Sequence, residues 1–300
     1  MSDITASHTL ADTLRTVAQM EGHGEENGNL FTELLHHVYD SHELELPFVG
    51  HIELPRFEPI HLGNLTLDLS ITKHVVFLWL SAVIVLLVTT VAARMNRKQT
   101  VPTGLGNLVE VFILYIRDEV VIPNMGPDGV RYLPYLLTTF FFILIMNLAG
   151  LVPYGSTATG NVSVTGGLAL IAFIMIQYAA IRSQGLGHYL KHLTGGVHWS
   201  LWLIMIPIEI LGLFTKPFAL MIRLFANMTG GHIVIVALIG LIFIFKSYVI
   251  TPIPIAFVLG INLLELFVAF LQAYIFTMLT SLFMGLGMQA AHEEGERHGY

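Results

Sequence analysis

Long apolar runs separated by short polar stretches organise the chain from residue 74 onward. Three of these runs have the length of a single membrane-spanning helix: 74–93, 132–152 and 166–181. About 20 consecutive apolar residues form a helix that crosses the roughly 30 Å hydrocarbon core of a bilayer. The pattern therefore predicts membrane-spanning helices at these positions.

Two further apolar segments, 201–245 and 255–288, are too long for one perpendicular span each. At 1.5 Å per residue, the first would be about 67 Å long as a single helix. It must therefore be strongly tilted, curved or broken, and the candidate breaks are Pro207, Pro217 and Gly230-Gly231. With the proline-containing turn between them, the two segments predict a long, steeply tilted C-terminal helical hairpin.

Residues 103–121 have a different pattern. Their apolar side chains form one stripe at helical spacing, and Glu110, Arg117, Asp118 and Glu119 lie elsewhere around the predicted helix. This arrangement predicts an amphipathic helix that lies along the cytoplasmic membrane surface. A buried re-entrant helix is the alternative.

Composition agrees with the pattern. The chain of 300 residues is 54% hydrophobic and 12% charged, whereas a soluble domain is about 25% charged. We therefore predict an all-α integral membrane protein with about five to six membrane helices, including the tilted hairpin, and one amphipathic surface helix. The chain has no cysteine, which excludes disulfides, thiolate metal sites and cysteine nucleophiles.

Charge divides the chain into three predicted regions. Residues 1–73 carry three Lys/Arg and twelve Asp/Glu, a net charge of −9, so the rest of the chain carries +2. The membrane domain is expected at 74–288 and a polar tail at 289–300. Because Arg94 and Arg97 directly follow the first span, the positive-inside rule places the N-terminal segment outside and the tail in the cytoplasm. A basic nucleic-acid-binding surface is excluded.

Histidines offer a second chemistry to consider. Those of the N-terminal segment have irregular spacing and are expected to face solvent. His188 and His192, after the third span, have the i, i+4 spacing of a zinc-binding pair. A third ligand is not evident in the sequence, so we predict no metal site.

Arg223 lies in the middle of the 201–245 segment, with apolar residues on both sides. An arginine at bilayer depth costs roughly 2.5–3.5 kcal/mol on insertion scales, so it is expected to be functional and to have a partner. Asn227 follows on the same helical face and can hydrogen-bond a guanidinium, but cannot neutralise it. A snorkelling arginine at a helix end is the alternative, which the long apolar flanks do not favour.

Other polar residues interrupt the two long segments. The earlier segment contains Glu209, Lys216 and His232, and the later one contains Asn262, Glu265 and Gln272 on one helical face. Ionisable groups in a membrane-spanning file are typical of proton relays, and a histidine paired with a buried carboxylate suits this role. The alternatives are a structural His232–Glu265 pair, a snorkelling Lys216 and an interhelical hydrogen bond from Gln272.

Three motifs resemble subunit a of the F-type ATP synthase family. The two most specific are Arg223-Leu-Phe-Ala-Asn227-Met-Thr-Gly-Gly-His232 and Glu265-Leu-Phe-Val-Ala-Phe-Leu-Gln272-Ala-Tyr-Ile-Phe-Thr. Asn147, in Ile145-Met-Asn-Leu-Ala-Gly-Leu-Val-Pro153, matches a third. The resemblance covers most of the chain from the first span onward and leaves out the acidic N-terminal segment. The carboxylate and imidazole are exchanged relative to some bacterial members, as in mitochondrial-type members.

This resemblance implies a role for each candidate residue. Arg223 would face the carboxylate of the rotor c-ring, with Gln272 as its neighbour across the hairpin and Asn227 on the same pathway. His232 and Glu265 would form the relay of the outer aqueous half-channel. Glu209 would line the inner half-channel, and the remaining members of the proton pathway would be Asn262 and Asn147.

The resemblance also implies the setting. The chain would be a non-catalytic, proton-translocating stator subunit that uses no cofactor and conducts H⁺, with Na⁺ as the alternative ion. Its partners would be the rotor c-ring, the peripheral-stalk b subunits, the rest of the ATP synthase complex and membrane lipid. The expected location is the bacterial inner membrane, and the mitochondrial inner membrane is the alternative.

Two other classes of protein fit the sequence less well. A self-contained proton or sodium channel or transporter would need its own acid beside Arg223. Glu209, about 21 Å away along a continuous helix, is too distant to serve easily. A purely structural membrane anchor would not carry this many buried polar residues.

Overall fold

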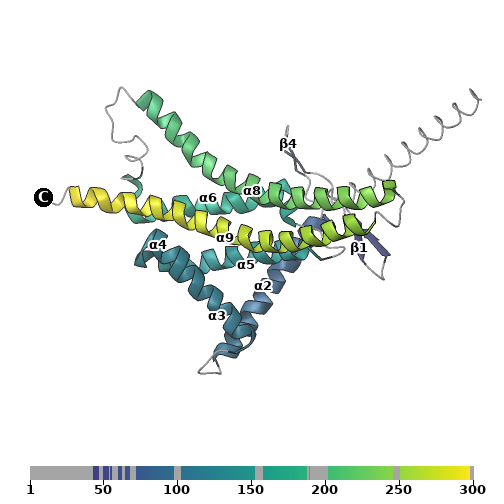
Figure 1. Cartoon of the computed structure of the whole chain (residues 1–300). Helices are drawn as coiled ribbons and strands as arrows, with labels where there is room; N and C mark the ends of the chain where they lie inside the picture. Colours follow the sequence, from purple (N-terminus) through teal and green to yellow (C-terminus); the bar gives the residue numbers. More distant parts are fainter. Residues whose placement is uncertain are drawn as a thin grey trace, which may run out of the picture. The chain divides into compact units, whose positions relative to one another are not determined.

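A computed structural model of the chain describes residues 43–46, 50–53, 55, 60–62, 65–67, 72–97, 103–152, 158–187, 189, 202–245 and 251–297. Helices make up most of these residues (Figure 1). Five described helices are long and apolar enough to cross a membrane: Lys73–Arg97, Pro127–Gly150, Val162–Gln184, Trp202–Leu241 and Pro252–Met288. The prediction of an all-α integral membrane protein is confirmed.

The helical elements follow one another from Lys73 to Arg297. They are α2 (Lys73–Arg97), α3 (Leu105–Tyr115), the π-helix η1 (Ile116–Val121), α4 (Ile122–Met125), the 3₁₀ helix η2 (Pro127–Tyr132), α5 (Leu133–Gly150), the 3₁₀ helix η3 (Ala158–Gly160), α6 (Val162–Gln184), α8 (Trp202–Phe245) and α9 (Pro252–Arg297).

Two short antiparallel β-hairpins precede α2. Strand β1 (Glu43–Leu46) pairs with β2 (Gly50–Glu53), and β3 (Ile60–Leu62) pairs with β4 (Leu65–Leu67). These strands lie in the acidic N-terminal segment, ahead of the membrane helices, so they do not change the fold class. Most of the histidines considered as metal ligands, including His188 and His192, lie outside the residues or side chains that the structure describes.

Local sequence signals start and end the membrane helices. The Asn161 side chain caps α6 by accepting a 2.8 Å hydrogen bond from the backbone N–H of Ser163. Gly185, which directly follows α6, has a φ of 79°, which favours glycine and stops the helix. Arg94 and Arg97 stand in the last turn of α2, where cations stabilise the helix dipole.

The two overlong apolar segments each form one continuous helix. Helix α8 has 44 residues and α9 has 46. Pro207, Pro217 and Gly230-Gly231 all lie inside α8 and do not interrupt it. Of the three alternatives, tilted, curved or broken, the broken helix is therefore excluded. A helix of this length measures about 66 Å, more than twice the hydrocarbon thickness, and must therefore be tilted or curved in a bilayer. The tail predicted after Met288 continues α9 as far as Arg297.

The described residues belong to two compact units. One contains Thr229–Leu264, and the other contains Ser41–Met228 and Glu265–Tyr300. Helices α2 to α6, the first part of α8 and the second part of α9 therefore belong to the second unit.

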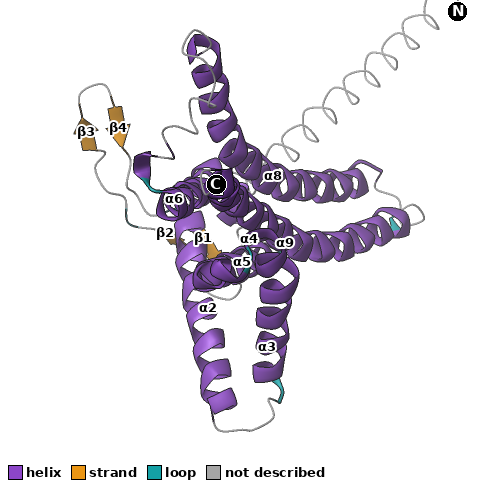
Figure 2. Cartoon of the chain, turned by 90° about the vertical axis from the view of Figure 1, so that its left-hand side faces the viewer, coloured by secondary structure: helices purple, strands orange, loops and turns teal. Residues whose placement is uncertain are grey.

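In the second unit, α2 and α3 pack side by side as a helical hairpin (Figure 2). The side-chain amide of Asn96 on α2 donates to Glu110 Oε2 at 3.0 Å and to the Gly106 carbonyl at 3.2 Å, both on α3. A Cβ atom at Gly106 would stand 2.0 Å from the Asn96 side-chain oxygen, so glycine permits this approach.

An aromatic cluster forms the core between α3, α5 and α9. The rings of Phe112, Phe140, Phe141 and Phe270 pack with centroid separations of 5.3–6.1 Å. Such tilted and edge-on pairs stabilise by roughly 0.5–1.5 kcal/mol each beyond the burial of their area. The cluster fixes the part of α9 that carries Glu265 and Gln272.

Candidate functional site

Arg223 is exposed on the surface of α8. A neighbouring face of the same helix packs inward through Leu220, Leu224 and Met228, which are at most 3% exposed. Among the described residues, Arg117 forms an ion pair with Asp118, and no ion pair includes Arg223. The guanidinium therefore lies inside a membrane-spanning helix and faces outward, without a carboxylate from the described part of its own chain.

Asn227, one turn after Arg223, is joined to α9. Its side-chain amide donates a 2.7 Å hydrogen bond to Gln272 Oε1. Gln272 is 2% exposed, whereas Asn227 is exposed. The structure thus brings together two predicted site residues that are 45 positions apart in the sequence and lie on different helices.

Glu265 is a buried carboxylic acid two turns before Gln272 on α9. It is 7% exposed, and its Oε2 atom has no hydrogen-bond partner within the described part of the chain. Burying a carboxyl group without partners is costly, so such residues mark functional sites more often than structural ones.

Asn147 on α5 is completely buried, with both ends of its amide bonded. The Thr159 hydroxyl of η3 donates to Asn147 Oδ1 at 2.8 Å, and Asn147 Nδ2 donates to the carbonyl of Ala269 at 3.3 Å. Ala269 stands one turn after Glu265. Asn147 therefore ties α5 and η3 to the part of α9 that carries the buried acid.

His232 and Asn262 belong to the other compact unit, Thr229–Leu264. Within that unit, His232 is half-buried and Asn262 is exposed. The pairing of His232 with Glu265 therefore stays a prediction.

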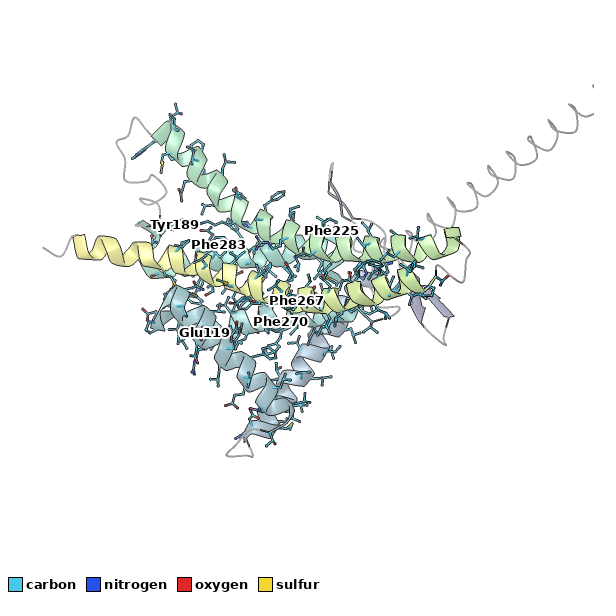
Figure 3. All side chains as sticks on the ribbon, in the orientation of Figure 1. Glu119, Tyr189, Phe225, Phe267, Phe270 and Phe283 are labelled. Atoms are coloured by element: carbon cyan, nitrogen blue, oxygen red, sulfur yellow. The ribbon has the colours of Figure 1, made fainter. Side chains whose placement is uncertain are left out.

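Glu209 lies half-buried in the first part of α8. Burial first, and then the negative charge of Glu209, raise the pKa of the Tyr189 hydroxyl. That hydroxyl donates to Gln177 Oε1 of α6 (Figure 3 labels Tyr189). Sequence analysis missed Tyr189 and Gln177, because nothing in their spacing connects them to a glutamate 20 or more residues later.

Lys216 lies between Glu209 and Arg223, seven residues from each, so the three share one face of α8 with steps of about 10.5 Å. Its Nζ sits 5.3 Å from the ring centroid of Phe283 on α9 (Figure 3). This cation–π contact holds the half-buried Lys216 at the α8–α9 interface. The snorkelling alternative for Lys216 stays a prediction.

The candidate residues lie in a region that known proteins share. A family model described as "ATP synthase A chain" matches residues 75–285. A protein of Chloroherpeton thalassium named "ATP synthase subunit a" is 51% identical over 273 residues, which cover 89% of this chain and 80% of the relative. "ATP synthase subunit a 2" of Chlorobium luteolum is 48% identical over 299 residues, covering 98% and 86%. "ATP synthase subunit a" of Anaeromyxobacter dehalogenans is 48% identical over 293 residues, covering 93% and 74%.

The chain belongs to the ATP synthase A chain family.

The family match includes every candidate residue from Asn147 to Gln272 and all five membrane-spanning helices except their extreme ends. The acidic N-terminal segment precedes the match to the family model, as expected. Alignment with the Chlorobium luteolum relative nevertheless covers almost the whole chain, so this member of the A chain family shares most of the N-terminal segment with at least one relative.

Metal binding is not indicated by the described residues. Within them, no group of three or more histidine, aspartate or glutamate side chains could hold a metal ion. The candidate polar residues of this A chain family member lie on α5, α8 and α9.

Proposed function

We propose that the chain is the proton-translocating stator subunit of a rotary F-type ATP synthase. It would provide two offset aqueous half-channels that lead to the carboxylates of a rotor ring, and Arg223 would separate them. The observation that carries this proposal is the exposed position of Arg223 on a membrane helix, without an acid from the described part of its own chain. A partner from another chain fits this position, and a rotor carboxylate has the required charge.

The outer half-channel would use His232 and Glu265, and Asn262 and Asn147 would be further members of the proton pathway. A proton entering from outside would pass His232 and Glu265 and neutralise a rotor carboxylate. Burial and the unpartnered Oε2 support Glu265 as a group that takes up and releases protons. The neutral rotor carboxyl can then turn through lipid, where a charged one is expensive.

The inner half-channel would begin near Arg223 and pass Lys216 and Glu209 on the same face of α8. A rotor carboxyl arriving there would lose its proton, because the nearby guanidinium favours the ionised form. The same positive charge would repel protons and prevent a direct leak between the half-channels. A transmembrane potential contributes about 2.3 kcal/mol per proton for each 100 mV.

Several finer features belong to the same proposal. The chain would catalyse no covalent step and would assemble with a c-ring, peripheral-stalk b subunits and the remaining ATP synthase subunits. Arginines directly after the first span support a cytoplasmic C-terminus and an outer N-terminus, and the bacterial relatives support an inner-membrane location. The ion would be H⁺.

Proton movement in inverted membrane vesicles tests the proposal. Vesicles carrying Arg223→Ala should lose ATP-driven pumping while passive leak, with the catalytic head removed, stays equal or rises. Arg117→Ala is the matched control, because Arg117 lies outside the membrane spans and has its own partner, Asp118, at 2.7 Å. Normal pumping by Arg223→Ala would overturn the proposal. Ion flux by the purified chain alone would instead support a self-contained channel.

A further inference from the structure

The second half of α9 approaches the segment η1–α4 at backbone distance. The Ser281 hydroxyl is fully buried and donates a 3.3 Å hydrogen bond to the carbonyl of Val120. One turn later, a Cβ atom built on Gly285 would stand 2.0 Å from the carbonyl oxygen of Asn124. Real Cβ atoms do not come within 3.0 Å of another heavy atom, so position 285 accepts only glycine without movement.

The π-helix η1 shapes the surface that receives α9. The backbone N–H of Ile122 bonds to the carbonyl of Arg117, which is the five-residue spacing of a π-turn. The Val120 carbonyl accepts from Ser281 and also from the Asn124 side-chain amide, at 2.8 Å. A carbonyl oxygen has two lone pairs, so it can hold both donors. Wide turns of this kind often occur at functional sites.

A second close approach fixes the same part of α9 from α6. A Cβ atom built on Gly287 would stand 2.8 Å from the Cβ atom of Ala180. The side-chain amide of Gln184 also donates to the Gly287 carbonyl. Because Gly285 and Gly287 face different elements, α9 cannot slide or rotate here without losing one contact. We call the contacts Ser281–Val120, Gly285–Asn124 and Gly287–Ala180 the α9 clamp.

We propose that Gly285 and Ser281 are positioning residues for the ion pathway. The α9 clamp sets the register of α9 at which Gln272 meets Asn227. Gln272 lies thirteen residues before Gly285, about 20 Å along the same unbroken helix. Close-packed interiors transmit displacement rather than absorb it. This inference rests on the proposed function, since it assigns the clamp a role in that pathway.

The expected displacement is large enough to matter. A methyl group at position 285 must move from 2.0 Å to at least 3.0 Å from the Asn124 oxygen, a shift of about 1 Å. The Asn227–Gln272 hydrogen bond is 2.7 Å long. Adding about 1 Å along its direction takes it beyond hydrogen-bonding distance.

Gly285→Ala is therefore the direct test. Gly260→Ala, also on α9, is the matched control, because a Cβ atom there meets nothing within 4 Å. The chain has no cysteine, so a pair of cysteines introduced at Asn227 and Gln272 can report the distance between these two positions. The rate at which a short bifunctional maleimide cross-links them is measured in membranes that hold the whole complex.

Gly285→Ala should slow the cross-linking and, with native Asn227 and Gln272, lower ATP-driven pumping by about ten- to a hundred-fold. Gly260→Ala should change neither. An unchanged cross-linking rate in Gly285→Ala overturns the inference, even if pumping is lost, because the loss would then have another cause.

Ser281→Val provides the second test if Gly285→Ala does not assemble. The branched apolar side chain removes the hydrogen bond to Val120 and crowds a fully buried contact. Slower cross-linking supports the clamp, and an unchanged rate in assembled complexes overturns it. The cross-linking rate does not depend on proton flow. Normal pumping by Arg223→Ala would therefore overturn the proposed function, and the cross-linking experiment would still test the clamp.

Discussion

The Asn227 side chain donates a 2.7 Å hydrogen bond to Gln272, joining α8 to α9 one turn beyond Arg223. The bond is positioned to hold the two helices together where the exposed guanidinium must meet its partner. Asn227 is exposed and Gln272 is 2% exposed, so loss of the Asn227 donor would leave the buried Gln272 amide oxygen without this hydrogen bond.

Asn227→Leu should therefore lower the stability of the complex, because it leaves the buried Gln272 amide oxygen without its donor. A hydrogen bond of this kind contributes about 0.5–1.5 kcal/mol, and a double-mutant cycle with Gln272→Leu should return an interaction energy of that size. The measurement is unfolding of the purified complex in denaturant. Additive effects of the two substitutions would show that the bond contributes nothing.

Glu265→Gln should slow proton flow without uncoupling it from ATP hydrolysis. The amide keeps the size of the side chain but cannot take up and release a proton. ATP-driven quenching of a pH-sensitive dye in vesicles measures the rate. Glu119→Gln is the control, since Glu119 is exposed in η1 and lies outside the membrane spans. An unaltered pumping rate in Glu265→Gln would count against a relay role.

Exchanging the two ionisable groups tests whether they act as a pair. The double variant His232→Glu/Glu265→His keeps one carboxylate and one imidazole in the proposed outer half-channel. We expect partial pumping activity in the double variant and less in either single variant. Equal activity in all three variants would argue that the residues work independently.

Thr159→Val should destabilise the fold near Glu265. It removes the donor to Asn147 while keeping the shape of the side chain, leaving a fully buried amide oxygen unsatisfied at a cost of about 1–3 kcal/mol. Thr138→Val is matched to it, because Thr138 is exposed and its hydroxyl donates to the Pro134 carbonyl of its own helix. Equal unfolding midpoints for the two variants would contradict the expectation.

The titration of Tyr189 should report the charge of Glu209. The pKa of Tyr189 is raised by burial and by that charge, so Glu209→Gln should lower it, though not to the ordinary tyrosine value. Folding favours the protonated phenol, so its contribution to stability is complete below the ordinary pKa of about 10 and is lost as pH rises through the raised value. Ultraviolet difference titration, with Tyr189→Phe subtracted, measures the shift. An unchanged pKa of Tyr189 in Glu209→Gln would show that the charge of Glu209 does not act on Tyr189.

Local sequence determined the helices. Apolar runs predicted the membrane helices because a bilayer demands that each spanning segment satisfy its own backbone hydrogen bonds, a requirement that acts on consecutive residues. Arg223, Asn147, Glu265 and Gln272 stood out for a related reason, since polar groups in such runs are costly. The two prolines of α8 were candidate breaks and do not break the helix, because a long helix can continue past a missing hydrogen bond when packing supports it.

Tertiary structure alone decided which of these residues meet. The bonds Thr159–Asn147, Asn147–Ala269 and Asn227–Gln272 join separate elements, two of them more than 40 positions apart. The approach of Gly285 to Asn124 spans 161 positions, and no local preference marks that glycine among the 27 in the chain. Sequence by itself determined where the helices lie and which residues are too polar for their surroundings. Packing of distant helices decided which partner each obtained, because a hydrogen bond or a close approach depends on docking geometry that neighbouring residues do not encode.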